Sequence, residues 1–555
     1  MKLTCAVFLT TIVSFAGASM AHAGDHIREL QTNAIKDGRA DFGHWGHEPD
    51  NYKSWGSHSN RLIPVYTFGT KDAGDKIDLR SYQGANSPYR SESELKRIYG
   101  RLPTDTLDLK AEYFDQTNVF DIQKAAINAG KKYVFLVIFD GMDWQTTQAA
   151  AIVRKNKVVY KEGRGTGLHF LDYTANGTTQ FGFMCTSPHN NGTTVNTNTQ
   201  TVLNPGGNLF GGYNATLGGP NPWTPGTDLL YPISKNEGTQ VVHAYTDSSS
   251  SATSMTCGIK TYNNAVNVDA AGHPVPTIAH LAQQQGYAVG AVSSVPISHA
   301  TPAAAYAHNV HRDDYQDLTR DMVGLKSISH PETPLPGLDV LIGGGYGDER
   351  RLDGKPSKED APAGSNFVPG NVYLTDADRD TIDRKNGGKY VVSTRIPGVN
   401  GHKHLLESAQ KAAETHSRLL GFYGVGAFGG HLPFATAEGD FRPTVGRSNK
   451  AEVYQEADLV ENPSLTDMTQ AAITVLSQNP KGFWLMIESG DVDWANHDNN
   501  LDNSIGAVWS GDAAIKSLTD WVETHSNWKE SVLIVTADHG HYLVLEKPEL
   551  LVETK

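Results

Sequence analysis

One stretch of the chain, Tyr133–Phe139, restricts the possible folds more than any other. It reads Tyr-Val-Phe-Leu-Val-Ile-Phe, a continuous apolar run of β-branched and aromatic side chains. Such a run is typical of a central parallel strand that is buried on both faces. It ends at Asp140, and open α/β sheets bind their ligands at the carboxyl ends of their strands. The run therefore predicts an α/β protein with polar site residues at that edge.

Further apolar runs repeat this pattern along the chain. They are Val241–Tyr245, Tyr287–Ser294, Val340–Ile342, Phe483–Ile487 and Ser531–Val535. The segments around them predict helices at about 274–285 and 402–420, and a further helix after Pro302 that extends through Arg312. This alternation predicts an α/β fold of three layers, in which a mostly parallel central sheet is flanked by helices and interrupted by loop insertions.

Three segments are expected to lie outside the alternation. Residues 24–55 are polar and show no periodicity. Residues 172–240 are rich in Gly, Asn, Thr and Pro, with turn-forming Asn-Gly and Pro-Gly pairs. Residues 346–450 are charged and interrupted by Gly and Pro. We therefore expect one domain over residues 24–555, with insertions at about 172–240 and 346–450.

The N-terminus has the form of a secretory signal. Lys2 precedes a mostly apolar segment from Ala6 to Ala16, and Ala21-His22-Ala23 is a small-x-small cleavage site. We expect residues 1–23 to be removed and the mature protein to be periplasmic or secreted. No membrane span is expected, because the apolar run is short and no second run follows.

Composition narrows the partners and the chemistry. The formal net charge is -14. A nucleic acid partner is not expected, because there is no surplus of basic residues to neutralise a phosphate backbone. An anionic ligand would have to be attracted by bound metal cations instead. Cys5 would leave with the signal, so Cys185 and Cys257 could form a disulfide, or could equally be two buried thiols.

Several polar residues that follow the apolar runs are suited to metal binding. Asp493 and His497 are four apart and would share one face of a helical turn, and a carboxylate with an imidazole suits Zn²⁺. Asp538 and His539 are adjacent at a strand end, where a loop can direct both at one ion. Each pair could instead have a purely structural role without a metal ion, because surface Asp–His pairs and turn residues are common.

A second group of residues offers oxygen ligands and an anion site. Asp140, Thr301 and Glu488 form an all-oxygen set that suits Mg²⁺ with water ligands, and His299 is expected to contact that ion through water. Ser248 is predicted at a helix N-terminus, where free N–H groups favour an anion such as phosphate. Asp247 and Ser248 could also be ordinary helix caps.

In type, order and internal spacing, these motifs resemble those of the alkaline phosphatase family over about residues 133–541. The motifs are Asp140-Gly-Met, Asp247-Ser-Ser-Ser-Ser-Ala-Thr, His299-Ala-Thr-Pro, Arg312, Glu488-x4-Asp493-x3-His497 and Thr-Ala-Asp538-His539. The resemblance implies an exported phosphomonoesterase with two zinc ions, one magnesium ion and a phosphoserine intermediate. Its partners would be small phosphate esters and inorganic phosphate, and a homodimer is possible.

The resemblance also implies a role for each residue. Ser248 would be the nucleophile, Arg312 would hold the phosphate, and Asp247 would hold Arg312 and the nucleophile loop. The implied ligands are Asp493 and His497 for the first zinc; Asp140, Ser248, Asp538 and His539 for the second zinc; and Asp140, Thr301 and Glu488 for the magnesium.

One departure from the family pattern concerns the first zinc. The family has a further histidine for it, after the Asp-His motif and before a Pro-Val-Tyr-like strand, but here the chain stops 16 residues after His539. The N-terminal His58-Ser-Asn-Arg-Leu-Ile-Pro-Val-Tyr66 resembles that segment, and Phe120-Asp-Ile122 resembles the family's closing stretch. We therefore expect a circular permutation with His58 as the missing ligand. His541 is the competing candidate.

Three other functions fit parts of the pattern. A phosphodiesterase of the same superfamily could share most ligands, although Arg312 favours a monoester dianion. A metal-free serine hydrolase could use Ser248 and His539 with an Asp, but the sequence lacks the Gly-x-Ser-x-Gly elbow. A non-catalytic metal-binding protein would keep the ligands and show no turnover.

Overall fold

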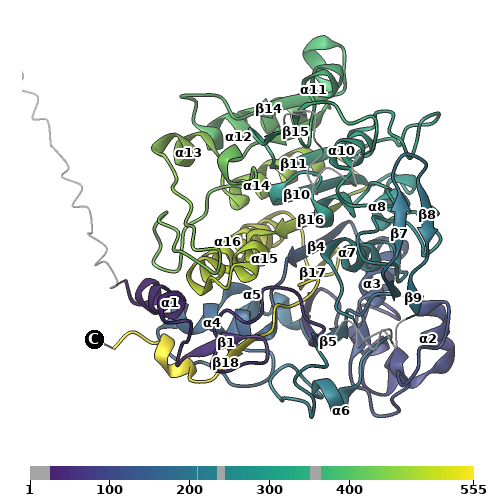
Figure 1. Cartoon of the computed structure of the whole chain (residues 1–555). Helices are drawn as coiled ribbons and strands as arrows, with labels where there is room; N and C mark the ends of the chain where they lie inside the picture. The colour runs from purple at the N-terminus through teal and green to yellow at the C-terminus, as the bar shows by residue number, and fades with distance from the viewer. Residues whose placement is uncertain (1–24, 209–210, 234–243, 351–363, 555) are drawn as a thin grey trace, which may run out of the picture.

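The computed structural model describes residues 25–208, 211–233, 244–350 and 364–554, and its centre is a ten-stranded sheet (Figure 1). In spatial order the strands are β14 (Tyr390–Thr394), β15 (Arg418–Phe422), β11 (Val340–Gly344), β10 (Ala288–Pro296), β16 (Phe483–Ser489), β4 (Tyr133–Phe139), β17 (Ser531–Thr536), β2 (Ile63–Phe68), β5 (Gln180–Cys185) and β3 (Phe114–Asp115). All pairings from β14 to β17 are parallel, whereas β2 runs antiparallel to both β17 and β5. The predicted mostly parallel sheet is confirmed.

Two layers of helices cover the sheet. One contains α12 (Gly401–Glu414), α14 (Leu465–Leu476) and α16 (Leu501–His525); the other contains α3 (Thr117–Asn128), α7 (Ser248–Cys257) and α8 (Ile278–Gln284) (Figure 1). Consecutive residues of β16 point to the two layers, as strand geometry requires. The ring of Phe483 packs 5.7 Å from that of Trp521 in α16, and the indole N–H of Trp484 donates to Gln123 in α3 at 2.8 Å. The three-layer prediction is confirmed.

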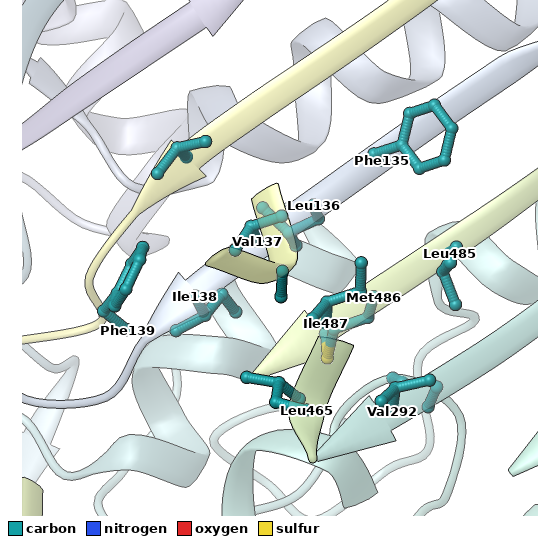
Figure 2. Packing of buried hydrophobic residues seen from close by; sticks show 14 of the residues in the cluster. Phe135, Leu136, Val137, Ile138, Phe139, Val292, Leu465, Leu485, Met486 and Ile487 are labelled. Atoms are coloured by element: carbon teal, nitrogen blue, oxygen red, sulfur yellow. The ribbon is translucent and has the colours of Figure 1, made fainter. Parts of the chain in front are cut away.

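The core explains the continuous apolar runs. Figure 2 shows side chains of β4, β16 and β10 packed together, with Leu465 of α14 against them. Phe135, Met486 and Ile487 are fully buried, and so are the residues on either side of them in their strands. Because both faces of these strands are covered, the runs Phe135–Phe139 and Phe483–Ile487 are continuously apolar and show no alternation with polar residues.

The other elements surround this centre. The helices are α1 (His26–Asp37), α2 (Glu92–Tyr99), α4 (Trp144–Lys155), α5 (His169–Asp172), α6 (Ala215–Gly218), α9 (Ala300–Ala303), α10 (Tyr315–Val323), α11 (Asp376–Ile382), α13 (Glu456–Glu461) and α15 (Asp491–His497). The remaining strands pair as β1 (Gly43–Trp45) with β18 (Leu543–Leu545), β6 (Asn190–Asn191) with β9 (Gly207–Asn208), β7 (Thr194–Asn196) with β8 (Thr201–Asn204), and β12 (Glu349–Arg350) with β13 (Gly370–Asn371). Within the described ranges, no helix is long and apolar enough to cross a membrane.

Some expectations about these segments are wrong. Residues 172–240 and 346–450 do not stay outside the sheet, because β5 from the first and β14 and β15 from the second are strands of it. The polar segment 24–55 contains the helix α1, whose buried face includes Ile27 and Ile35.

The helix expected through Arg312 ends early, at Ala303 in α9. Tertiary contacts hold the following residues in other conformations: Asn309 forms an antiparallel bridge with Val266, and the Arg312 N–H donates to the Asn264 carbonyl at 2.8 Å. The strand expected before Ser248 is also wrong in its described part, since Ala244 and Tyr245 are in no strand, and residues 241–243 lie outside the described ranges. Residues 1–23, the predicted signal, lie outside them too.

Candidate active site and metal centre

The N-terminus of α7 presents Ser248 at the edge of the sheet where β4, β16 and β17 end. Asp247 is the N-cap, and its Oδ1 accepts from the Ser250 N–H at 3.0 Å. All of α7 is buried, although seven of its ten residues are Ser or Thr. A polar helix end buried in this way requires partners beyond the helix. The capping role considered for Asp247 is therefore present, and its role in the site stays a prediction.

The predicted ligands of the second zinc surround the Ser248 hydroxyl. Its Oγ lies 3.4 Å from Asp140 Oδ1 and 3.3 Å from His539 Nε2. The same Nε2 lies 3.3 Å from Asp140 Oδ1 and 3.4 Å from Asp538 Oδ2. Three chain segments thus bring two carboxylates, one imidazole and one hydroxyl close together. Such a donor set suits Zn²⁺.

A second cluster combines His58, Asp493, His497 and His541, whose ligand atoms all lie within 4.8 Å of one another. Asp493 and His497 lie on α15, and their Oδ2 and Nε2 atoms are 3.5 Å apart, as their spacing predicts. His58 Nε2 is 3.5 Å and His541 Nε2 is 2.6 Å from Asp493 Oδ1. The two histidines that competed as the missing residue are therefore both present.

The histidine tautomers in this cluster point to a cation. His58 Nδ1–H donates to the Thr246 carbonyl and His497 Nδ1–H donates to the Gly56 carbonyl, each at 2.8 Å. Both Nε2 lone pairs are thereby turned toward each other, 3.0 Å apart. Facing lone pairs repel unless a positive charge stands between them. That charge is either a proton on His58, whose pKa Asp493 raises against the effect of burial, or a metal ion.

The third predicted set, all oxygen, is fully buried. Asp140 Oδ2 and Glu488 Oε1 are buried and have no hydrogen-bond partner among the described residues. The Thr301 hydroxyl lies beside Glu488, whose other oxygen accepts from Ser293. A buried carboxylate oxygen without a donor is costly, and a hard cation such as Mg²⁺ would satisfy it.

The electrostatics of the carboxylates agree with this need for cations. Burial, reinforced by the negative charges of Asp493, Asp538 and Glu488, raises the pKa of Asp140 well above its usual range. Burial likewise raises the pKa of Glu488 to about 8 and that of Asp538 to about 6. Burial would also raise the pKa of Asp493, but the three surrounding histidines hold it well below the ordinary value. Several buried carboxylates close together remain ionised only when cations compensate them.

Arg312 is held by Asp247, the residue that precedes Ser248. Its Nη1 donates to Asp247 Oδ2 at 3.0 Å, and its Nη2 lies 3.3 Å from His299 Nε2. Although burial opposes it, the charge of Arg312 lowers the pKa of Asp247 to about 2. Burial and the same guanidinium lower the pKa of His299 to about 3, so His299 is neutral and accepts. Its predicted contact with an ion through water stays a prediction.

Three residues of the site were not singled out from the sequence. Ser293, which donates to Glu488, pairs with it in register across β10 and β16. A serine inside an apolar strand is a usable signal, because a buried hydroxyl needs a partner. Asn496 donates to the Gly141 carbonyl at 2.9 Å, and Trp494 packs 5.8 Å from His299. Neither has a comparable signal in one sequence. Cys185 and Cys257 are free and buried.

Curated proteins with similar sequences include bacterial alkaline phosphatases. The chain is 30% identical over 294 residues to alkaline phosphatase 4 of Bacillus subtilis (strain 168), covering 53% of this chain and 49% of the relative. It is 31% identical over 310 residues to alkaline phosphatase H of Pseudomonas aeruginosa (strain UCBPP-PA14), covering 55% and 59%. The chain thus spans about half the length of the curated relatives that it matches.

Solved structures include similar chains at low identity. The alkaline phosphatase from the Antarctic bacterium TAB5 is 22% identical, with a TM-score of 0.41 over 74% of this chain and 80% of that one. The Thermus thermophilus alkaline phosphatase is 22% identical, with a TM-score of 0.41 over 74% and 60%.

A family model described as alkaline phosphatase matches residues 229–549, which is more than half of the chain. The match contains Ser248, Arg312, Asp493 and Asp538, whereas Asp140 and His58 lie before it. The chain belongs to the alkaline phosphatase family.

Proposed function

We propose that the protein is a metal-dependent phosphomonoesterase that works through a phosphoserine intermediate. The observation that carries this proposal is the position of Ser248 Oγ, 3.4 Å from Asp140 Oδ1 and 3.3 Å from His539 Nε2, with the Arg312–Asp247 pair alongside. A nucleophile among metal-ligand groups and next to a guanidinium is suited to phosphoryl transfer, in which positioning and charge stabilisation do most of the work.

The residues present fit three cations. His58, Asp493 and His497 would hold the first zinc, with His541 hydrogen-bonded to Asp493. Asp140, Ser248, Asp538 and His539 would hold the second zinc. Asp140, Thr301 and Glu488 would hold magnesium. When bound, such cations lower the pKa of a coordinated hydroxyl and compensate the charge on phosphoryl and leaving oxygens.

The side chains then divide the work. Ser248 Oγ attacks phosphorus in line, forming a new P–O bond while the bond to the ester oxygen breaks and the alcohol leaves. Water then attacks the phosphoserine, and inorganic phosphate leaves as Ser248 regains its proton. Arg312 binds two nonbridging oxygens through its planar fork, and Asp247 keeps that fork in place. Deprotonation of Ser248 is favoured as pH rises, so the rate is expected to peak above neutrality.

A metal-free serine hydrolase is disfavoured by the surroundings of His539. In a catalytic triad, an aspartate accepts from Nδ1–H while Nε2 faces the serine. Here His539 Nδ1 has no partner in the described part of the chain, and the carboxylates of Asp140 and Asp538 crowd the Nε2 instead. Burial and His58 also hold the pKa of His539 well below its usual value, which makes it a poor base.

The circular permutation is part of the proposal. Support comes from β2, which follows His58 and pairs antiparallel with β17, the strand that leads to Asp538. The described ends of the chain also lie together: β1 pairs with β18, and the His26 ring is 2.9 Å from the Leu550 carbonyl. Nearby termini are the condition under which a domain tolerates permutation.

We also propose one catalytic domain over residues 24–555, export directed by residues 1–23, and no nucleic acid partner; a homodimer is possible.

Hydrolysis of an aryl phosphate monoester, compared with the matching aryl diester, tests the reaction class. Faster turnover of the monoester is expected, because its dianion gives Arg312 more charge to bind. Preference for the diester would instead favour a phosphodiesterase of the same superfamily. Binding of metal without turnover of either ester would indicate a non-catalytic metal-binding protein.

A further inference from the structure

A group of metal-ligating side chains, distinct from the centre around Ser248, lies where α10 meets the loops on either side of it. His308 precedes α10, Asp321 is on its last turn, and His330 follows it. One ligand atom from each lies within 4.8 Å of the other two. These residues share no member with the zinc and magnesium sets assigned above. The group does not depend on the proposed phosphatase function.

His308 has the hydrogen bonding of a metal ligand. Its Nε2 lies 3.0 Å from the Val275 carbonyl, which can only accept, so the proton is on Nε2 and the lone pair is on Nδ1. That Nδ1 is buried and has no partner among the residues that the structure describes. A ligating histidine in proteins usually donates its other N–H to a carbonyl or carboxylate in this manner. Burial lowers the pKa of His308, which keeps this lone pair free.

Asp321 and His330 complete the group. Asp321 is fully buried, and its carboxylate lies 2.9 Å from His330 Nδ1. The backbone N–H of His308 donates to Asp321 Oδ2 at 3.0 Å, and the Ser327 hydroxyl donates to Asp321 Oδ1 at 2.5 Å. These two hydrogen bonds fix the orientation of the carboxylate. Oriented ligands of this kind favour binding, because little side-chain entropy remains to be lost.

The two rings are spaced as ligands of one ion would be. The ring centroids of His308 and His330 lie 5.1 Å apart with an interplanar angle of 48°. Two imidazoles at Zn–N distances of about 2.0 Å in tetrahedral geometry have centroids roughly 5 Å apart. The side chain of His330 is 17% exposed, so an ion and a solvent ligand can enter from that edge. His280 packs on His308 but is not counted, because its Nδ1 accepts from the Thr277 N–H.

We propose that His308, Asp321 and His330 bind a transition metal ion of the zinc class. The ion would join both ends of α10 to the segment that precedes it. That segment carries Arg312, four residues after His308, so the ion would stabilise the loop that holds the phosphate-binding guanidinium. Two imidazoles and one carboxylate, with a place for solvent, match the ligand preferences of Zn²⁺.

The test is the metal content of the full-length protein after equilibration with zinc and removal of free ion, measured by native mass spectrometry. His330→Ala is expected to bind about one ion per chain fewer than wild type. The control His273→Ala, which breaks an exposed His–Asp pair with Asp269, should keep the wild-type content. Equal zinc content in His330→Ala and in His273→Ala would overturn the proposal.

A second variant tests the site in case His330→Ala does not fold. Asp321→Asn keeps the shape and an acceptor oxygen, and should show the same loss of about one ion. The same difference is expected in a His497→Ala background, where the centre around Ser248 is impaired. Failure of the phosphatase proposal would leave this difference intact, whereas unchanged zinc content in Asp321→Asn would reject this site alone.

Discussion

His58 Nε2 lies 3.0 Å from His497 Nε2, although the two residues are 439 positions apart in the chain. Each ring donates its Nδ1–H to a backbone carbonyl, so the two lone pairs converge on one point beside Asp493. The relation joins the N-terminal segment to the helix α15. It is the geometric basis for assigning the first zinc site to His58, Asp493 and His497.

Replacement of His58 tests that assignment. His58→Ala should lower zinc content and reduce kcat/KM by more than about 100-fold, since loss of an outer partner of a ligand already costs 10–100-fold. His47→Ala is a suitable control, because His47 is in the same N-terminal region and pairs with Glu48 near the surface. Full zinc occupancy in His58→Ala would contradict both the ligand role and the circular permutation.

Ser248→Ala tests the nucleophile. The variant should lose roughly 10⁴- to 10⁶-fold in kcat and form no phosphoenzyme, because the attacking oxygen is gone. Ser254→Ala is the matched control: this serine lies in the same buried helix, and its hydroxyl donates only to the Ser250 carbonyl at 3.0 Å among the contacts described. Quench-flow labelling with a radioactive phosphate ester would measure both. Labelled Ser248→Ala protein would rule out this residue as the nucleophile.

Arg312→Lys should separate two contributions to phosphate binding, the planar geometry of the guanidinium and its positive charge. A lysine keeps the positive charge near Asp247 but cannot bind two oxygens side by side. Loss of one charge-assisted hydrogen bond should lower kcat/KM by about 10- to 100-fold. Inhibition by inorganic phosphate should weaken by a similar factor. Unchanged inhibition by phosphate would mean that Arg312 does not hold the anion.

The buried His431 predicts a pH dependence of stability. Burial opposes protonation, but Glu452 and Asp491 raise the pKa of His431 from 6.5 to about 10. Because the folded state binds this proton more tightly, the stabilisation is complete below pH 6.5 and is lost as pH rises to about 10. The free energy of unfolding in urea should fall over that range by more in wild type than in His431→Gln.

A matched control for that experiment is His402→Gln, which alters an exposed histidine 2.8 Å from Asp467. It should keep the wild-type slope of unfolding free energy against pH. The same slope in His431→Gln as in wild type would show that the buried ion group does not carry the dependence.

Local features of the sequence were sufficient to predict some of the contacts in the candidate site. Asp493 and His497 lie close together because their spacing matches one helical turn. The position of Asp140 at the end of β4 could be predicted because a strand covered on both faces appears in the sequence as a continuous apolar run. The same local features cannot predict which residues far apart in the chain lie next to each other in the fold. His58 and His541 both lie beside Asp493, and no spacing rule decides between residues on different loops.

Tertiary contacts account for the errors in the fold. The alanine-rich stretch after Pro302 favours a helix by propensity, but α9 stops at Ala303 because Asn309 and Arg312 bond to the segment around Asn264 and Val266. Likewise, β14 and β15 are short strands at one edge of the sheet. Their apolar runs are brief and lie within a charged stretch of sequence, so they were not predicted as strands.

Cations held by these residues are proposed to be required for phosphoryl transfer to Ser248. The most direct test is the hydrolysis of a simple aryl phosphate before chelation, after exhaustive chelation, and after zinc and magnesium are added back. We predict that chelation abolishes turnover and that the two cations together restore it. Undiminished hydrolysis by protein that mass spectrometry shows to be free of metal would contradict the account.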